Sequence, residues 1–343
     1  MLTLVWSVSI YLALSSIVIM VMLIGRRLFL ERLERRRAAQ AKVLRSAMIR
    51  FGADEDADEL KRQLRELPLI VVADAGFEFL ALVRGEERAR IERVLSEIGV
   101  DDVLRRQLWA GNRSTRIYSA ERLAAFASPK TEQALIKALG DRSRQVRIAA
   151  AISLGELQRL PPLREVLRKI GYRGQRSRRM IDVFRAAGAE RAGELREVAV
   201  DRNTYPLLRA SAISAIGQTG DYGQIGFLQE CAMDRNGDIA AAAINALGDL
   251  AHPSSEPAIL AGLDNPDWRV RSEAARAAGS IGLRNAAGKL SALMEDEQWT
   301  VRYWAASSLK NIGREGVEML QAIAEGVSSR SQRTASMVLA ENG

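Results

Sequence analysis

An arginine returns at a fixed interval, the distance from Arg116 to Arg147, through the C-terminal two thirds of the chain. It occupies every position of this register but one, where Ala240 stands: Arg116, Arg147, Arg178, Arg209, Arg271, Arg302 and Arg333. Small residues, mostly alanine, follow three positions later, and glycine or alanine follows eight positions later in most copies. A fixed period of this size indicates supersecondary units stacked one on the next.

Each copy has the pattern of a pair of helices. It begins with a turn rich in Asp and Asn, residues that cap the start of a helix. An alanine-rich helix follows, with apolar residues at helical spacing such as Ile239, Ile244 and Leu247. A glycine near its end permits a sharp stop, and a shorter amphipathic stretch completes the copy. Two helices this short cannot bury their apolar faces alone, so we expect the copies to stack.

Three copies carry the motif most clearly. They are Asp141…Val146-Arg147, Asp264…Val270-Arg271 and Asp296…Val301-Arg302, each followed by Ala-Ala and then by Leu-Gly, Ala-Gly or Ile-Gly. On these residues the chain from about Arg113 onward resembles the HEAT-repeat family, specifically the short variety named after phycobilisome (bilin) lyases. The resemblance implies an all-α fold, a right-handed α-solenoid of helix pairs. It also implies a structural ladder in which arginines bridge to aspartates of adjacent repeats: Arg147, Arg209, Arg271 and Arg302.

The first residues of the chain suggest a membrane anchor. Residues 2–25 carry no charge and, at about 1.5 Å per residue, are long enough to cross a bilayer core of roughly 30 Å as one transmembrane helix. A basic cluster follows at once, including Arg26, Arg27, Arg35, Arg36 and Arg37. The positive-inside rule then predicts a single-pass protein of the bacterial inner membrane, with its N-terminus outside and its C-terminal domain cytoplasmic. The alternative, a cleaved signal peptide, lacks its basic start and has too long an apolar core.

These features divide the chain into four predicted segments. They are an anchor at 1–25, a basic juxtamembrane helix at 26–50, a divergent helical cap at 51–110 and the repeat solenoid at 111–343. Residues 26–50 hold nine Lys or Arg and two Glu, so most of the net charge of +8 lies there. A basic segment next to an anchor suits anionic lipid headgroups. The near-neutral remainder argues against nucleic acid as a partner.

Basic residues also gather in the middle of the repeat region. Between 159 and 191 there are ten basic and three acidic residues, and the excess centres on Arg173, Arg176, Arg178 and Arg179. We interpret this basic region as a docking site for an acidic partner or for a membrane surface. The alternative is a solvated charged face.

Aromatic residues gather in the last two full copies. Trp268 and Trp299 stand at the same register position, three before the ladder arginine, with Tyr303 and Trp304 close by. Other copies place Arg or Gly at that position, which is not the pattern of a core residue. We therefore predict that these aromatic residues are anchors of a protein interface. The alternative is that they pack beneath the loops between repeats.

The sequence lacks the usual signatures of catalysis. It has no phosphate-binding glycine loop, no G-x-S-x-G and no H-E-x-x-H, and its one Cys and one His cannot form a Cys/His metal site. We expect no cofactor and a non-catalytic scaffold or regulatory subunit that holds a membrane-associated protein partner. By analogy with other membrane-anchored HEAT proteins, it would be accessory to a membrane glycosyltransferase of an exopolysaccharide system. The alternative, from the same resemblance, is a bilin (phycobiliprotein) lyase or isomerase.

Overall fold

A computed structural model describes residues 15–16, 18–28, 42, 44, 46–49, 51, 57–172, 178–326 and 328–341. Within these ranges every regular element is helical, either α-helix or a single 3-10 turn. The chain forms two compact units, Met1–Thr131 and Glu132–Gly343. The all-helical prediction is confirmed, whereas the handedness of the solenoid and the four predicted segment boundaries stay predictions.

The first unit contains a run of short helices, followed by a helix that crosses the boundary between the units. The helices of the first unit are α2 (Ala57–Arg65), α3 (Leu69–Leu80), α4 (Gly85–Glu97), α5 (Val100–Ala110) and α6 (Arg113–Leu123), and the crossing helix is α7 (Pro129–Ala138). The apolar helix α3 packs against α4 and α5, and α5 packs against α6. Burial of Val72, Leu95 and Leu104 shows that this unit has an apolar interior of its own.

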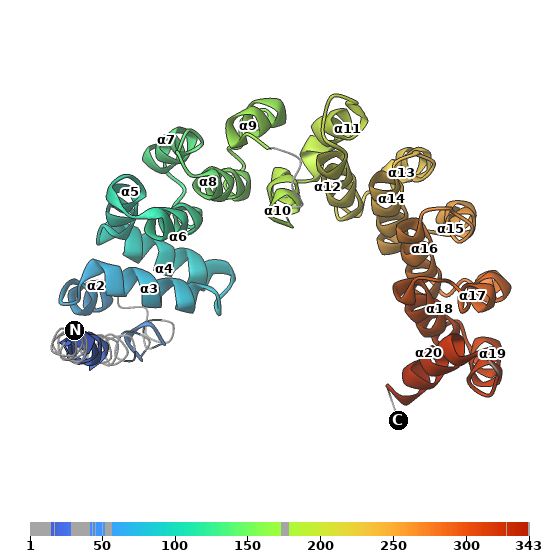
Figure 1. Ribbon diagram of the computed structural model, residues 1–343. Helices are drawn as coiled ribbons and strands as arrows, with labels where there is room; N and C mark the ends of the chain where they lie inside the picture. Colours follow the sequence, from blue (N-terminus) through green and yellow to red (C-terminus); the bar gives the residue numbers. More distant parts are fainter. Residues whose placement is uncertain are drawn as a thin grey trace, which may run out of the picture. The chain divides into compact units, whose positions relative to one another are not determined.

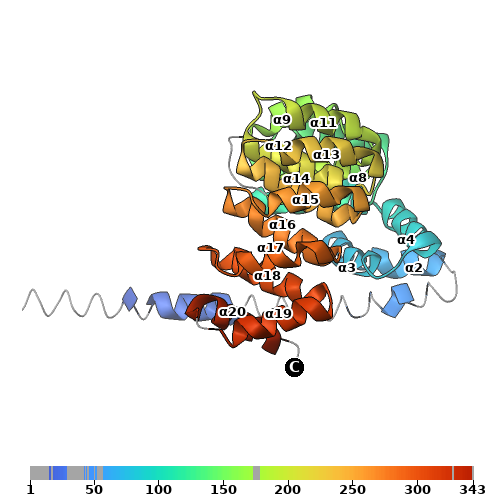
Figure 2. The same cartoon turned by 90° about the vertical axis from the view of Figure 1, so that its right-hand side faces the viewer.

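The second unit consists of two rows of helices that alternate along the chain (Figures 1 and 2). The inner row is α8 (Arg144–Glu156), α10 (Arg178–Ala187), α12 (Pro206–Gly217), α14 (Gly237–Leu250), α16 (Trp268–Ser280), α18 (Trp299–Asn311) and α20 (Ser329–Ala340). The outer row is α9 (Leu163–Ile170), α11 (Ala192–Val200), α13 (Ile225–Ala232), α15 (Glu256–Gly262), α17 (Ala287–Leu293) and α19 (Arg314–Ala324). Each inner helix contacts the next inner helix, so the repeats stack as their period predicts.

The inner helices α14, α16 and α18 begin at equivalent positions of the repeat, because the turns before them have the same hydrogen bond. In three successive turns a side-chain oxygen accepts the backbone N–H two residues on: Asp234 from Asn236, Asn265 from Asp267, and Asp296 from Gln298. The turn residue in register is therefore Asn265 and not the predicted Asp264. Asp264 instead pairs with Lys289 of α17.

Close approach between inner helices explains the register glycines. A Cβ atom added to Gly248 of α14 would lie 2.7 Å from the Cβ of Ala277 on α16, and one added to Gly279 would collide with the Ser308 hydroxyl on α18. Both glycines lie inside their helices, so they do not make the predicted sharp stop. The stop comes three residues later, in a left-handed residue such as Ala251, whose φ is 50°.

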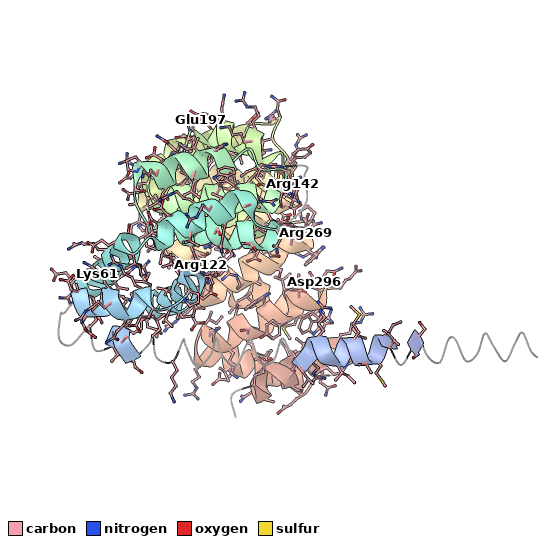
Figure 3. The ribbon with its side chains drawn as sticks, turned by 90° about the vertical axis from the view of Figure 1, so that its left-hand side faces the viewer. Lys61, Arg122, Arg142, Glu197, Arg269 and Asp296 are labelled. Atoms are coloured by element: carbon pink, nitrogen blue, oxygen red, sulfur yellow. The ribbon has the colours of Figure 1, made fainter. Side chains whose placement is uncertain are left out.

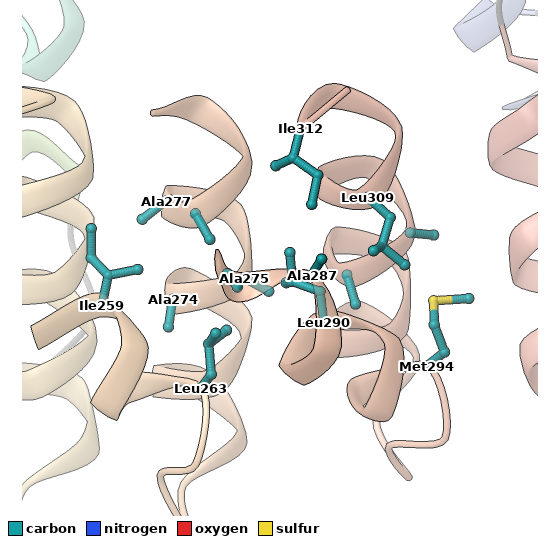
Figure 4. Packing of buried hydrophobic residues seen from close by; sticks show 14 of the residues in the cluster. Ile259, Leu263, Ala274, Ala275, Ala277, Ala287, Leu290, Met294, Leu309 and Ile312 are labelled. Atoms are coloured by element: carbon teal, nitrogen blue, oxygen red, sulfur yellow. The ribbon is translucent and has the colours of Figure 1, made fainter. Parts of the chain in front are cut away.

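Small and branched apolar side chains fill the space between the two rows. In the C-terminal half of the second unit Ile259 and Leu263 pack from the outer row, and Ala274 and Ala275 from α16 (Figure 4). Leu290, Met294 and Leu309 continue the same core through the next repeat. Ala275 also accepts a hydrogen bond from the Ser308 hydroxyl at 2.7 Å, which fixes α16 and α18 at close range.

The prediction of a single-pass inner-membrane protein is wrong on the described residues, where no helix is long and apolar enough to cross a bilayer. Of the proposed anchor at 2–25, residues 2–14 and 17 lie outside the described ranges. Residues 18–28 are helical. Arg26 and Arg27 lie on this helix and are exposed, and Arg35, Arg36 and Arg37 lie outside the described residues.

Candidate functional site

Three ladder arginines, Arg147, Arg271 and Arg302, bind the turn that precedes their own helix, whereas Nε of Arg209 donates to the Ala199 carbonyl of α11. In α16, Nη1 of Arg271 donates to the carbonyl oxygens of Asn265 and Pro266, at 2.8 and 2.9 Å. In α18, Nη1 of Arg302 donates to those of Asp296 and Glu297, at 2.6 and 3.0 Å. A guanidinium carries five N–H donors in a fixed fork, which suits several converging carbonyl groups. These side chains are committed inside the protein and do not face a ligand.

Two ladder arginines also reach a carboxylate of the next repeat, and both do so at the same separation along the chain. Nε of Arg271 donates to Asp296 at 2.7 Å, and Nη2 of Arg209 donates to Asp234 at 3.2 Å. At the equivalent position after Arg147 and Arg302 stand Tyr172 and Val327, and neither carries a carboxylate. The Arg147 guanidinium bonds the Ile170 carbonyl instead, and Nε of both arginines is buried without a partner among the described residues.

The aromatic surface, formed by Trp268, Trp299, Tyr303 and Trp304, lies on α16 and α18. Trp268 and Trp299 are the first residues of their helices, and 38% and 52% of their surfaces are exposed. Trp299 stacks on Tyr303 with ring centroids 5.3 Å apart and an interplanar angle of 24°. Tyr303 meets Trp304 edge to face, and both are only half-buried. The four side chains thus divide into two exposed tryptophans and two supporting rings.

Charged residues border the aromatic surface on both sides. The Arg269 guanidinium lies 5.6 Å from the Trp268 ring centroid and pairs with Asp267 at 2.7 Å, and Figure 3 shows Arg269 and Asp296 on the same edge of the unit. On the other side Arg330 follows Trp299 by one repeat and is exposed, and its guanidinium makes no hydrogen bond or ion pair with another described residue. Sequence reasoning missed Arg330, although the register alone places it next in this row.

The structure divides the predicted basic region. Arg173 and Arg176 lie outside the described residues, Arg178 is the first residue of α10, and Arg179 is half-buried on that helix. Much of the surrounding basic excess is neutralised by carboxylates. The ion pairs are Arg159–Glu132, Arg164–Glu197, Lys169–Glu165, Arg185–Asp182 and Arg191–Glu194. Three of these carboxylates lie outside 159–191, so the local charge count overstated the positive field.

A cavity of about 420 Å³ opens between the C-terminal ends of α8 and α10. Its polar lining includes Glu156, Gln158, Glu190 and Arg191. The Arg191 guanidinium is already engaged, because it donates to Glu194 and to the carbonyl oxygens of Leu160 and Pro161. No nucleophile or cysteine lies in this lining, so its chemistry is that of a shallow polar pocket.

The other reactive groups described in the second unit include a half-buried thiol and a histidine that caps a turn. The described residues hold no group of three or more His, Cys, Asp or Glu side chains able to bind a metal ion. Burial raises the pKa of the Cys231 thiol to about 11, so the thiol stays protonated and poorly nucleophilic at neutral pH. His252 caps a short 3-10 turn, where its Nδ1 accepts the Ser254 backbone N–H at 3.2 Å.

Comparison with solved structures finds other helical repeat proteins at low identity. Human deoxyhypusine hydroxylase in complex with glycerol matches at 16% identity and a TM-score of 0.30, over 83% of this chain and 95% of that chain. The karyopherin Kap121p bound to the SUMO protease Ulp1p matches at 13% identity and a TM-score of 0.39, over 87% of this chain but only 41% of that chain. The Escherichia coli protein YibA matches at 17% identity and a TM-score of 0.38, over 83% of this chain and 97% of that chain. At these values the likenesses say nothing of function.

Comparison at the level of sequence identifies the repeats themselves. No curated protein sequence matches the chain significantly. The family described as HEAT repeats matches residues 102–180, 225–310 and 256–340. These ranges cover more than half of the 343 residues and contain the ladder arginines of α8, α16 and α18. The chain belongs to the family of HEAT-repeat proteins.

Proposed function

We propose that the chain is a non-catalytic scaffold that binds a protein partner through the aromatic surface on α16 and α18. HEAT solenoids expose a continuous row of helix ends and side chains, which suits the binding of an extended partner. The aromatic surface differs from the rest of this row, because the equivalent positions in α12 and α14 are Pro206 and Gly237. Function then lies where the repeats differ, and the repeated arginines maintain the scaffold.

The exposure of Trp299 carries the proposal. Trp buries a large area at an interface at little cost in side-chain entropy, and it is enriched among residues that dominate binding energy. In Trp299 about half of that area is in contact with water, although the ring is already oriented by its stacking on Tyr303. An oriented, solvent-exposed indole is the arrangement expected of an anchor that awaits its partner.

Site-specific photo-crosslinking tests this function. A photoreactive phenylalanine analogue is placed at Trp299 in the full-length protein, in cells of its source, and the crosslinked product is identified by mass spectrometry. We expect one dominant partner, whose recovery falls at least tenfold when Trp268→Ala is added. If no discrete partner crosslinks above background, the scaffold function is wrong.

A matched control separates interface chemistry from general surface reactivity. Trp109, at the end of α5, is another exposed tryptophan, with 43% of its surface accessible, and it belongs to the first unit. The same photoreactive residue at position 109 should not capture the partner. Equal capture from both positions would mean that the crosslinked protein was captured because it is abundant in the cell, and not because it binds the aromatic surface.

Two narrower predictions from the sequence, the association with a glycosyltransferase and the bilin lyase activity, are not part of this proposal. The predicted association with a membrane glycosyltransferase finds no support in the family match or in the described residues. The alternative function as a bilin lyase is not favoured by any observation in the described part of the chain. A lyase would still be revealed by transfer of a bilin to a phycobiliprotein subunit in a purified reaction.

A further inference from the structure

Trp268, Trp299 and Arg330 form a row of exposed side chains. The proposed scaffold function leaves the class of ligand open, and this row indicates it. These residues belong to α16, α18 and α20, and each stands one repeat period after the last. From this row we infer that the chain binds an extended, polyproline II segment with an acidic residue at one end. The inference rests on the proposed function, and it adds the class of ligand and the spacing of its side chains.

The spacing of the inner helices matches the period of that conformation. Packed helices lie about 8–10 Å apart, and at Gly279 only the small Ser308 side chain lies between α16 and α18. A polyproline II helix rises about 3.1 Å per residue with three residues per turn, so equivalent side chains recur about every 9 Å. A segment running along the row would thus offer one side chain to each repeat, at every third residue.

The tryptophans suit proline in this conformation. A proline ring presents a flat apolar face to an indole, and the polyproline II backbone leaves its carbonyl groups free to accept hydrogen bonds. The indole N–H groups of Trp268 and Trp299 donate to no other residue in the described part of the chain. Each tryptophan can therefore supply an apolar face and one donor, as in other aromatic grooves that bind proline-rich segments.

The charged residues at the two ends of the row determine where the acidic residue of the bound segment lies. Arg330 is exposed and without an ion pair to another described residue, although its charge also acts on Glu295. At the other end of the row Arg269 is neutralised by Asp267 and lies 3.7 Å from Asp238. The exposed Glu297 precedes Trp299 and would repel a carboxylate placed over the tryptophans. The acidic residue of the partner therefore belongs at Arg330, with prolines at Trp299 and Trp268.

Synthetic peptides test this inference with the purified full-length chain. The probes are two 12-residue peptides, one with the order Pro-x-x-Pro-x-x-Glu and one with the reverse order, because such grooves can bind a segment in either direction. Binding is measured by titration calorimetry. We expect one of the two to bind at least tenfold more tightly than a peptide whose prolines are two residues apart. Absence of binding by both at millimolar concentration would overturn the inference.

Substitutions assign the contacts. Trp299→Ala should weaken binding at least tenfold and Trp268→Ala about fivefold, whereas Trp109→Ala should leave it unchanged. Arg330→Glu should weaken the glutamate peptide about fivefold and strengthen a matched peptide that carries lysine instead. Circular dichroism must show the same helix content in every variant. Binding that survives the Trp268→Ala, Trp299→Ala double variant would place the peptide elsewhere and contradict the inference.

The two proposals can fail separately. If position 299 crosslinks a partner that contains no such proline spacing, the scaffold function stands and the ligand class is wrong. If the row instead mediates self-association, sedimentation of the full chain will show a dimer that Trp299→Ala dissociates, which would contradict the peptide inference. Peptide binding without a cellular partner would support the ligand class and refute the scaffold function as proposed.

Discussion

The central repeats and the C-terminal repeats of the second unit use the same ladder position but distribute charge differently. Around α8–α11 the basic residues form pairs on the surface, and in Arg164–Glu197 the two side chains are 77% and 59% exposed. Around α16–α18 the pair Arg271–Asp296 is largely buried, with side chains 19% and 6% exposed. A dense run of basic residues in the sequence therefore marks weak surface pairs, and the pair with the larger energetic consequence joins α16 to the turn before α18.

The largest expected effect is the loss of the buried partner at the C-terminal end. Asp296→Asn keeps the side-chain oxygen that accepts the Gln298 backbone N–H, as Asn265 does in the repeat before, but it leaves the Arg271 guanidinium without its carboxylate. Breaking a buried pair on one side costs about 3 kcal/mol or more. We expect a lower urea midpoint for Asp296→Asn, measured by the loss of helical circular dichroism.

Asp264→Asn is the matched control for this substitution. Asp264 lies one residue before the turn position of its repeat, and its pair with Lys289 is exposed, with side chains 66% and 42% accessible. Exposed pairs contribute about 0–1 kcal/mol. If both substitutions lower the urea midpoint equally, the difference in burial between the two kinds of pair has no energetic meaning.

Local sequence predicted the repeats, and the family resemblance implied arginine bridges between them, but neither identified the aspartate that each arginine reaches. The period, the helix pairs and the equivalence of Trp268 and Trp299 follow from comparing the copies along the sequence. The pairing of Arg271 with Asp296 does not, because the offset between the two residues is set by how two repeats stack. For the same reason the charge count at 159–191 omitted Glu194 and Glu197, which come from the next helix. Arg330 was missed because it was not aromatic, although it shares the register of the tryptophans.

Acid should loosen the C-terminal repeat before the central ones. The hydroxyl groups of Ser331 and Ser328 donate to Glu295 and lower the pKa of its carboxyl. Because the folded pKa lies below the unfolded value, this contribution is complete above about pH 4.5 and is lost as the pH falls through the folded pKa. These bonds join the segment after α17 to the start of α20, so their loss should weaken the attachment of α20.

Melting temperatures at several pH values test this dependence. Glu295→Gln should lower the melting temperature at pH 6, and this effect should shrink as the pH falls through the folded pKa of the Glu295 carboxyl. The pKa of Glu165 in α9 is also lowered, by Lys169, but that bond stays within one helix. Glu165→Gln should therefore change melting less at every pH. A larger effect of Glu165→Gln would reverse the comparison between the two regions.

A smaller effect of opposite sign is expected where α14 ends. Ala251 adopts a left-handed conformation with φ of 50° and ψ of 34°, and the equivalent positions in the repeats before and after it are Gly220 and Gly282. A residue with a Cβ loses about 1–2 kcal/mol there, partly offset by the greater freedom of glycine in the unfolded chain. Ala251→Gly should stabilise the protein by about 0.5–1 kcal/mol in urea unfolding, whereas Ala242→Gly, inside α14, should destabilise it by a similar amount.

The smallest effect is expected in α10, within the basic region. Arg185 of α10 pairs with Asp182 at 2.9 Å, and their side chains are 56% and 42% exposed. An i,i+3 pair on a helix surface contributes about 0.2–0.5 kcal/mol, because water screens both charges and the long arginine loses freedom when it is held. Asp182→Asn should shift the urea midpoint by an amount close to the error of the measurement, and it should leave binding of the proline peptide unchanged. A loss of binding would mean that the ligand reaches α10, and the central repeats would then share the function assigned to the aromatic surface.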